Sequence, residues 1–199
     1  MWFFEEQAAH NGYTAIAGVD EAGRGPLAGP VVSAAVILPS LDEAAGIDDS
    51  KKLSPARRDR LFEHIFRTAT AIGVGILNAA EIDRINILQA ALQSMAIAVR
   101  NLQPQPDYLL IDGNFEIPCH LPQEAIKKGD SRSASIAAAS IIAKVTRDRM
   151  RRSYHRPYPQ YGLVRHKGYP TKAHREAIRV HGCSPIHRKT FRGVAEHLS

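Results

Sequence analysis

The sequence predicts one domain of the α/β or α+β class. Short apolar segments typical of strands alternate with helical patterns in mixed order, as they do in such domains. The chain has 199 residues, of which 44% are hydrophobic, so it can bury one sizeable core. It holds no internal repeat or long linker. We therefore expect a single domain over residues 1–199, in which residues from about 150 to 199 form a basic C-terminal subdomain.

Five extended segments are expected, most of them short runs rich in apolar and β-branched residues. In chain order they are residues 13–19, 31–38, 70–77, 108–112 and 125–128. A glycine-rich loop joins the first two. Three of the five end on an aspartate or are followed closely by one, which places carboxylates at strand ends.

Helical patterns fill most of the remaining chain. Ser54 followed by proline is a typical helix start, and the apolar residues after it recur at i, i+4 spacing. Residues 81–102 form a long helical pattern that is broken near Asn86. A run that begins at Ser133 is rich in Ala and Ser and then basic, which favours a helix packed closely on its neighbours. From Pro157 onward, frequent prolines predict loops and short helices.

Basic charge is concentrated near the C-terminal end. Residues 144–199 carry 14 Lys and Arg against 3 Asp and Glu, whereas residues 1–143 carry 12 against 17. A basic segment beside an acidic one indicates a polyanionic partner, with nucleic acid foremost. A solvated basic face is the alternative.

Several classes of protein and site are disfavoured. Only Cys119 and Cys183 occur, so no disulfide framework is expected. No apolar run could span a membrane, and the acidic first residues do not resemble a signal peptide. The Cys and His spacings fit no familiar zinc pattern. We expect a cytoplasmic protein without a membrane partner.

Four carboxylates are the candidate chemical centre: Asp20, Glu21, Asp112 and Asp130. They follow extended segments, and ligands usually bind at the carboxyl ends of strands in α/β sheets. Carboxylates without a nearby Cys or His cluster suit Mg²⁺ or Mn²⁺ rather than zinc. Such ions can activate water and stabilise a leaving oxygen in phosphodiester cleavage.

A structural role is the alternative for each carboxylate. Aspartates after strands often cap turns. The adjacent pair Asp20–Glu21 is harder to explain in this way, because a turn needs no second acid. The glycine-rich loop that follows lacks the phosphate-binding P-loop pattern, which disfavours nucleotide hydrolysis.

Blocks of sequence along nearly the whole chain resemble bacterial ribonuclease HII. In order they are VDEAGRGPLAGPV, DDSKKLS, LLIDGN, KKGD, AASIIAKVTRDR, PQYG, HKGYPT and HR-x-x-F. The resemblance implies a ribonuclease H-like fold: a mixed five-stranded sheet flanked by helices, with a small helical C-terminal part. It also implies that Asp20, Glu21, Asp112 and Asp130 bind the catalytic Mg²⁺ or Mn²⁺ ions.

The resemblance further implies a substrate and a product. The substrates are RNA–DNA hybrids and duplex DNA that contains ribonucleotides. The cut falls on the 5′ side of a ribonucleotide and leaves a 3′-hydroxyl and a 5′-phosphate. By the same resemblance, Gly23, Arg24 and Gly25 approach the ribose and its 2′-hydroxyl, which distinguishes RNA from DNA. Tyr169 stacks beside the next sugar.

Other residues receive weaker assignments. Ser50 and Lys51 match polar and basic family positions near nucleic acid, while Lys144 either contacts phosphate or pairs with an active-site carboxylate. Helical spacing allows at most half of a basic strip to face DNA, and that strip comprises Arg147, Arg149, Arg151 and Arg152. Histidines of the basic tail, His166 and His187 among them, receive no catalytic role.

Three alternatives are weighed against this reading. Ribonuclease HIII shares the fold but usually has glutamate as the fourth acid and an added N-terminal domain. A different metal-dependent nuclease of the same superfold, or a non-catalytic nucleic-acid binder, would also carry this fold. We expect a monomer, and no Gln-plus-aromatic motif that would dock a sliding clamp is visible at the C-terminal end.

Overall fold

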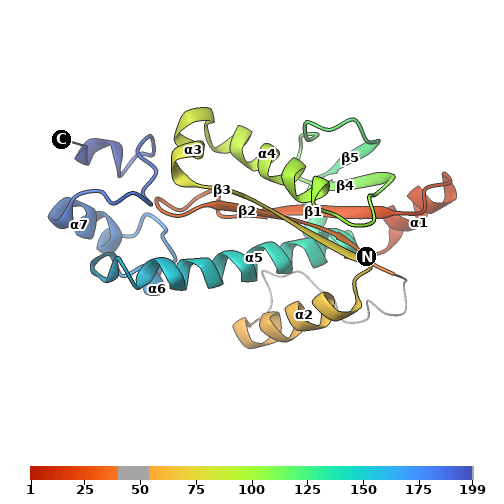
Figure 1. Ribbon diagram of the computed structural model, residues 1–199, viewed down its shortest axis with the longest axis horizontal. Coiled ribbons are helices and arrows are strands. Elements are labelled where there is room, and N and C mark those ends of the chain that lie inside the picture. The colour runs from red at the N-terminus through yellow and green to blue at the C-terminus, as the bar shows by residue number, and fades with distance from the viewer. Residues whose placement is uncertain (40–53, 199) are drawn as a thin grey trace.

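The computed structural model describes residues 1–39 and 54–198, and its centre is a mixed five-stranded sheet (Figure 1). The strand order is β3-β2-β1-β4-β5. β1 pairs antiparallel with β2, and β2 with β3, whereas β4 runs parallel to both β1 and β5. The strands are β1 Ile16–Ala22, β2 Val31–Ile37, β3 Ala71–Leu77, β4 Tyr108–Asp112 and β5 Gln123–Ile126. This confirms the expected mixed sheet.

Helices cover both faces of the sheet. In the described part of the chain they are α1 Phe3–His10, α2 Pro55–Thr68, α3 Ala79–Ile85, α4 Ile87–Arg100, α5 Ala134–His155, α6 Leu163–His166 and α7 Lys172–His181. Short 3₁₀ turns are η1 Gly129–Ser131, η2 Pro159–Tyr161 and η3 Ala195–His197. Figure 1 shows α3 and α4 on one face and α5 with α2 on the other. None of the described helices is long and apolar enough to cross a membrane.

β2 is buried on both faces, which explains its continuous apolar sequence. Because successive side chains point to opposite sides of a sheet, Ala34 and Val36 join the cluster under α5 and α2. Ala35 and Ile37 join the cluster under α4.

Glycines allow the helices to approach the sheet closely. A Cβ at Gly18 on β1 would overlap the backbone of Ser135 and Ile136 at the start of α5. Gly73 and Gly75 on β3 have the same relation to the α4 backbone. Gly18 therefore allows a close contact with α5 on one face of the sheet, and Gly73 and Gly75 allow one with α4 on the other.

Several element boundaries differ from the sequence-based prediction. β1 continues past Val19 to Ala22, because Asp20 and Glu21 still pair with β2. The fifth strand ends at Ile126, and Gly129 and Asp130 lie in the turn η1. Helix α1 was not predicted. The predicted break at Asn86 is confirmed, since this residue has φ 67° and its side chain caps α4.

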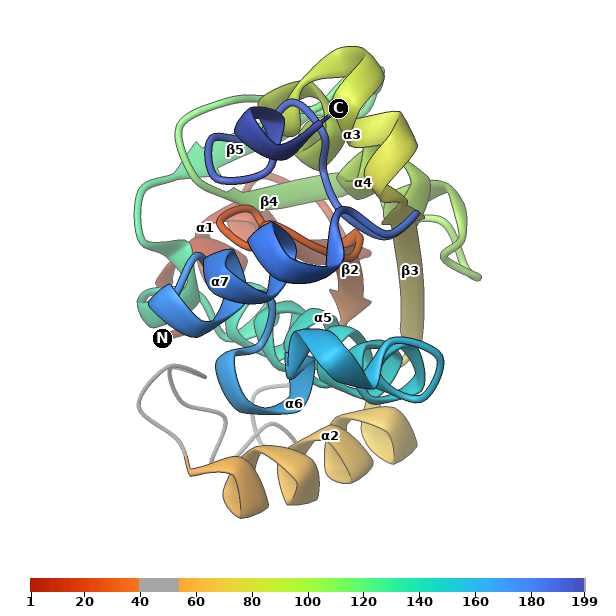
Figure 2. The ribbon, with the colours of Figure 1, turned by 90° about the vertical axis from the view of Figure 1, so that its left-hand side faces the viewer.

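The C-terminal segments gather where the β1–β2 loop projects from the sheet, at the left of Figure 1. Figure 2 shows this end toward the viewer, with α6 and α7 in front. Leu27 and Ala28 of the loop share one apolar cluster with Tyr161, Leu163 and Ile178. The loop is thus packed between the sheet and the C-terminal helices, while α5 runs continuously through both regions.

Replacing Gly18 by Ala should destabilise the protein by about 3 kcal/mol, because the added methyl meets backbone that cannot move aside. Urea unfolding measures the change. Gly12→Ala is the control: nothing lies within 4 Å of its Cβ, so only the strain of its positive φ, about 1 kcal/mol, is expected. Equal losses in the two variants would contradict the close contact between β1 and α5.

Candidate active site

A cleft with a volume of about 300 Å³ lies at the ends of β1 and β4, beside the β1–β2 loop. It is lined by Asp20, Glu21, Ala22, Gly23, Arg24, Gly25, Asp112, Ser140, Lys144, Arg147 and Tyr169. Most of the sequence-predicted site residues in the described part of the chain therefore meet in one place. Ser50 and Lys51 lie outside the described residues.

Asp20 and Glu21 are consecutive residues near the end of β1. Asp20 is only 4% exposed. Its Oδ1 accepts a hydrogen bond from the backbone N–H of Glu21 at 2.7 Å, and Ser140 on α5 also hydrogen-bonds to it. Oε1 of Glu21 lies 3.4 Å from Nη1 of Arg24 in an ion pair. Strand pairing and helix α5 thus fix the first acid, while the second faces the mouth of the cleft.

Asp112 is the last residue of β4, which runs parallel beside β1 with Val19 opposite Ile111. Asp112 is therefore next to Asp20 across the ladder. Its Oδ1 accepts a hydrogen bond of 2.7 Å from the N–H of Gly129. Asp130 follows Gly129, is 3% exposed and is not among the lining residues. Three acids share the cleft, and the fourth adjoins a partner of Asp112.

Burial and mutual repulsion raise the pKa values of Asp20 and Glu21. The pKa of Asp20 lies well above its ordinary value because of burial first, then the charges of Glu21 and Asp112. Burial also raises the pKa of Glu21, an effect that Arg24 opposes and Asp112 reinforces. The cleft therefore carries clustered negative charge that a cation would relieve.

The donor set fits a hard divalent ion, since it consists of carboxylate oxygens. Yet no three His, Cys, Asp or Glu side chains in the described residues already form a group that could hold a metal. One oxygen of each lining acid accepts a hydrogen bond, from Glu21 N–H, from Arg24 or from Gly129 N–H. Because a carboxylate has two oxygens, such a contact does not prevent it from binding a cation.

Two buried arginines hold the β1–β2 loop. Arg147 donates from Nε to Pro30 O (3.1 Å) and from Nη2 to Ala28 O (3.3 Å). Arg188 donates to three carbonyl oxygens: those of Gly29 (3.0 Å), Arg24 (2.9 Å) and Gly23 (2.6 Å). Burial lowers the pKa of both guanidinium groups, that of Arg188 to about 9.

Two of the four arginines in the expected basic strip on α5 are engaged inside the protein, so at most half of the strip can face DNA, as its helical spacing predicts. Arg147 is buried against the loop, and Arg151 donates from Nη1 to the carbonyls of Leu163 and Val164. Arg149 pairs at 3.0 Å with Glu63 in an exposed contact. Buried arginines look like surface arginines in a sequence, because nothing in their spacing shows which carbonyls they will meet.

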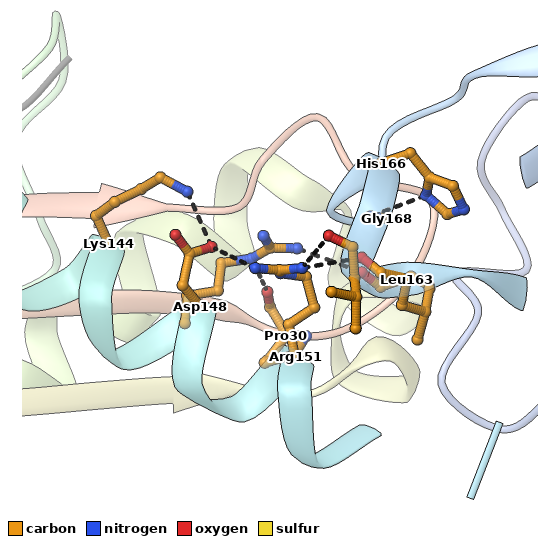
Figure 3. A network of polar contacts seen from close by, with 10 residues as sticks. Pro30, Lys144, Asp148, Arg151, Leu163, His166 and Gly168 are labelled. Atoms are coloured by element: carbon orange, nitrogen blue, oxygen red, sulfur yellow. Dashed lines mark hydrogen bonds and ion pairs between the residues drawn. The ribbon is translucent and has the colours of Figure 1, made fainter. Parts of the chain in front are cut away.

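Lys144 pairs with Asp148 rather than with a cleft carboxylate. Its Nζ lies 3.1 Å from Asp148 Oδ1, and Arg151 Nη2 lies 3.6 Å from the same oxygen (Figure 3). Burial lowers the pKa of Lys144, although Asp148 opposes the change. Lys144 still lines the cleft with its ammonium group partly exposed.

Tyr169 lies beside Gly25 in the wall of the cleft. It is 45% exposed, and a Cβ at Gly25 would lie 3.3 Å from its Cε1. The ring and the Gly23–Gly25 loop therefore form adjacent parts of the cleft wall. The sequence-based reading gave no role to Arg188 and His174, which hydrogen-bond to the loop and to Tyr169 respectively. Arg188 lies in the HR-x-x-F block, which was a signal for it, whereas His174 lies outside the recognised blocks.

Known proteins match the chain over nearly its full length. Residues 17–194 match the family model described as Ribonuclease HII. A Ribonuclease HII of Geobacter sulfurreducens is 62% identical over 198 residues, covering 100% of this chain and 91% of the relative. The Ribonuclease HII of Geobacillus kaustophilus is 55% identical over 195 residues, covering 98% and 75%.

Solved structures agree with these matches. The ribonuclease H2 of Pyrococcus horikoshii has a TM-score of 0.78 and 28% identity, covering 92% of this chain and 96% of that one. The RNase HII of Archaeoglobus fulgidus, solved in complex with PCNA, has a TM-score of 0.77 and 28% identity, covering 90% and 96%. An RNase HIII solved with Mn²⁺ is 21% identical, with a TM-score of 0.75, and shares the fold.

The family model, the relatives and the solved structures agree with one another and with the position of the acids at the ends of β1 and β4. The chain belongs to the ribonuclease HII family, whose members are metal-dependent endoribonucleases that degrade the RNA of RNA–DNA hybrids.

Proposed function

We propose that this enzyme cuts duplex DNA on the 5′ side of an embedded ribonucleotide, leaving a 3′-hydroxyl and a 5′-phosphate. One observation carries the proposal: three of the four acids, the Gly23–Gly25 loop and Tyr169 line the same cleft. The group that would cleave and the group that would recognise a ribose are therefore only a few residues apart.

Asp20, Glu21, Asp112 and Asp130 would hold Mg²⁺ or Mn²⁺. When bound, such ions supply an activated water and neutralise charge at the leaving oxygen. The support from this chain is the raised pKa of Asp20 and Glu21, which marks a surplus of negative charge in the cleft. Arg24, half exposed beside Glu21, is placed to leave that carboxylate and meet a phosphate instead.

The loop geometry suggests how a 2′-hydroxyl would be recognised. Arg188 draws the carbonyls of Gly23 and Arg24 inward. In a trans peptide the C=O of one residue and the N–H of the next point in opposite directions. The N–H groups of Arg24 and Gly25 are therefore directed away from Arg188, as donors for a sugar oxygen, and glycine at residue 25 leaves room beside Tyr169.

The remaining assignments are part of the same proposal. Lys144 would contact a phosphate, with Asp148 holding its ammonium group in place. Ser50 and Lys51 keep their predicted contact with nucleic acid. We propose a cytoplasmic monomer. The absence of clamp docking through the C-terminal residues stays a prediction, and the Archaeoglobus relative was solved in complex with PCNA.

A labelled DNA duplex with one ribonucleotide should be cut once, on the 5′ side of the ribose, when Mg²⁺ or Mn²⁺ is present. An all-DNA duplex should stay intact, because it offers no 2′-hydroxyl to the loop amides. Products resolved beside a full RNA–DNA hybrid give the cleavage map. Cutting confined to the long hybrid would remove the assigned roles of Gly23, Arg24, Gly25 and Tyr169.

Asp20→Asn should abolish cleavage yet stabilise the metal-free protein by on the order of 1 kcal/mol. The folded-state pKa of Asp20 is raised, so its ionised form costs stability at pH 7, and the amide removes that cost while keeping an acceptor for Glu21 N–H. Saturating metal should stabilise the wild type by about 2.7 kcal/mol at 100 times Kd, and this variant far less.

Asp107→Asn is the matched control for that experiment. Asp107 accepts hydrogen bonds from Thr14 and Ala15, outside the cleft, so the variant should keep both cleavage and the stabilisation by metal. Thermal unfolding with and without Mg²⁺ or Mn²⁺ measures both. Undiminished turnover or metal stabilisation in Asp20→Asn would contradict the assignment.

A further inference from the structure

The segment from Ser184 to Arg188 lies behind the β1–β2 loop and is connected to the turn that carries Tyr169. Arg188 N–H donates to Leu27 O at 2.8 Å, and Gly29 N–H donates to Ile186 O at 2.8 Å. His187 forms an isolated antiparallel bridge with Ala28. This segment is therefore paired to the back of the β1–β2 loop as if it were a further strand.

A chain of hydrogen bonds runs from the same segment to Tyr169. Nδ1 of His187 lies 3.1 Å from the backbone N of Ser184, and its Nε2 lies 3.2 Å from Nε2 of His174. Nδ1 of His174 lies 3.1 Å from Tyr169 O. The residue that carries the ring is thus tied at its carbonyl to the residue that precedes Arg188.

The donors fix the direction of this chain. A backbone N–H can only donate, so His187 Nδ1 is an acceptor and the proton sits on its Nε2. That N–H donates to Nε2 of His174, which must carry its own proton on Nδ1 and donate it to Tyr169 O. The relay runs from Ser184 N–H through both imidazoles to Tyr169 and requires that both be neutral.

The surroundings favour neutral imidazoles. His174 and His187 are 0% and 1% exposed, and burial lowers the pKa of each to about 4. His166 stacks on His174 with ring centroids 4.3 Å apart. Its own Nδ1 lies 3.3 Å from the N–H of Gly168, the residue before Tyr169. A second imidazole therefore supports the same turn of backbone (Figure 3).

The Arg188 guanidinium completes the arrangement at the loop. It is 0% exposed and donates to three loop carbonyls from three different nitrogens, which are held apart in a rigid plane that the single nitrogen of a lysine ammonium does not reproduce. Two consecutive residues thus fix the loop and the ring. Arg188 hydrogen-bonds to the carbonyls of Gly23 and Arg24, and His187 is connected to Tyr169 through His174.

We infer that His187 and Arg188 are positioning residues that set the distance between the Gly23–Gly25 loop and Tyr169, and through it the preference for a single embedded ribonucleotide. The inference rests on the proposed function of that cleft. A single ribonucleotide offers one ribose to the loop and the ring, whereas a long hybrid offers further riboses on either side that can still be bound when the loop or the ring is displaced. Misplacing the loop or the ring should therefore cost more on the single-ribonucleotide duplex.

The relay can be tested in the wild-type protein without any substrate. Long-range ¹H–¹⁵N correlation of ¹⁵N-labelled histidines at pH 7 reports which ring nitrogen carries the proton. We expect the Nε2–H tautomer for His187 and the Nδ1–H tautomer for His174, each neutral. The opposite tautomer or a charged ring at either residue would overturn the relay.

The functional part is tested with three variants. His174→Leu removes the donor to Tyr169 O, and His174→Asn restores an N–H near the position of Nδ1. Arg188→Lys keeps the positive charge but loses the planar guanidinium group that donates to the three loop carbonyls. The readout is the ratio of kcat/KM on the single-ribonucleotide duplex to kcat/KM on the long hybrid. This ratio is independent of the folded fraction, because both substrates share it.

Tyr161→Phe is the matched control. It deletes one hydrogen bond of the same region, from Tyr161 Oη to Gly182 O at 2.9 Å. It leaves intact the hydrogen bonds of Arg188 to the loop and of His174 to Tyr169. We expect the ratio to fall about 10- to 100-fold in His174→Leu and Arg188→Lys. It should recover partly in His174→Asn and stay unchanged in Tyr161→Phe.

The outcomes separate this inference from the proposed function. An unchanged ratio in His174→Leu and Arg188→Lys, or an equal fall in Tyr161→Phe, would overturn the positioning role while the wild type still cuts at the ribonucleotide. A wild type that leaves the single-ribonucleotide duplex intact would overturn the proposed function and the preference tied to it. The measured tautomers of His174 and His187 would then test the hydrogen-bond relay independently of any substrate.

Discussion

The architecture of the cleft depends on two buried guanidinium groups that hold backbone carbonyls of the β1–β2 loop. Arg147 reaches this loop from α5, and Arg188 reaches it from the C-terminal segment. Buried charge is costly unless it is fully hydrogen-bonded, so the loop and the arginines stabilise each other only when both are in place. With its carbonyls drawn inward, the loop presents its amides to the cleft, and the helical C-terminal part becomes an integral part of the site.

A second constraint is the like charge of the acids. Strand pairing brings Asp20 and Asp112 side by side, and α5 covers Asp20, so both burial and repulsion oppose ionisation. The contacts with Gly129 N–H and Arg24 offset that repulsion in part. In the proposed function the same acids would share a divalent ion with a phosphate of the nucleic acid, because both offer hard oxygen ligands.

Periodicity and turn chemistry predicted an α/β or α+β domain and the break at Asn86, and the unusual Asp20–Glu21 pair indicated the acids as a group. The mixed five-stranded sheet was predicted by the resemblance to ribonuclease HII. The sequence did not predict which basic residues face nucleic acid. Arg147 and Arg188 belong to the basic tail by composition, but the fold buries them against carbonyls that lie more than 100 residues away in the chain. Long-range contacts of this kind, like the tie from His174 to Tyr169, leave no local pattern.

The central claim is that one cleft joins the acids to amides that recognise a ribose. The most direct measurement is a crystal structure of Asp20→Asn bound to a DNA duplex with one ribonucleotide. The account predicts the 2′-oxygen within hydrogen-bond distance of the N–H groups of Arg24 and Gly25, with the phosphate on its 5′ side beside Asp112. A 2′-oxygen that contacts neither amide, or a ribose bound away from both the Gly23–Gly25 loop and Tyr169, would contradict it.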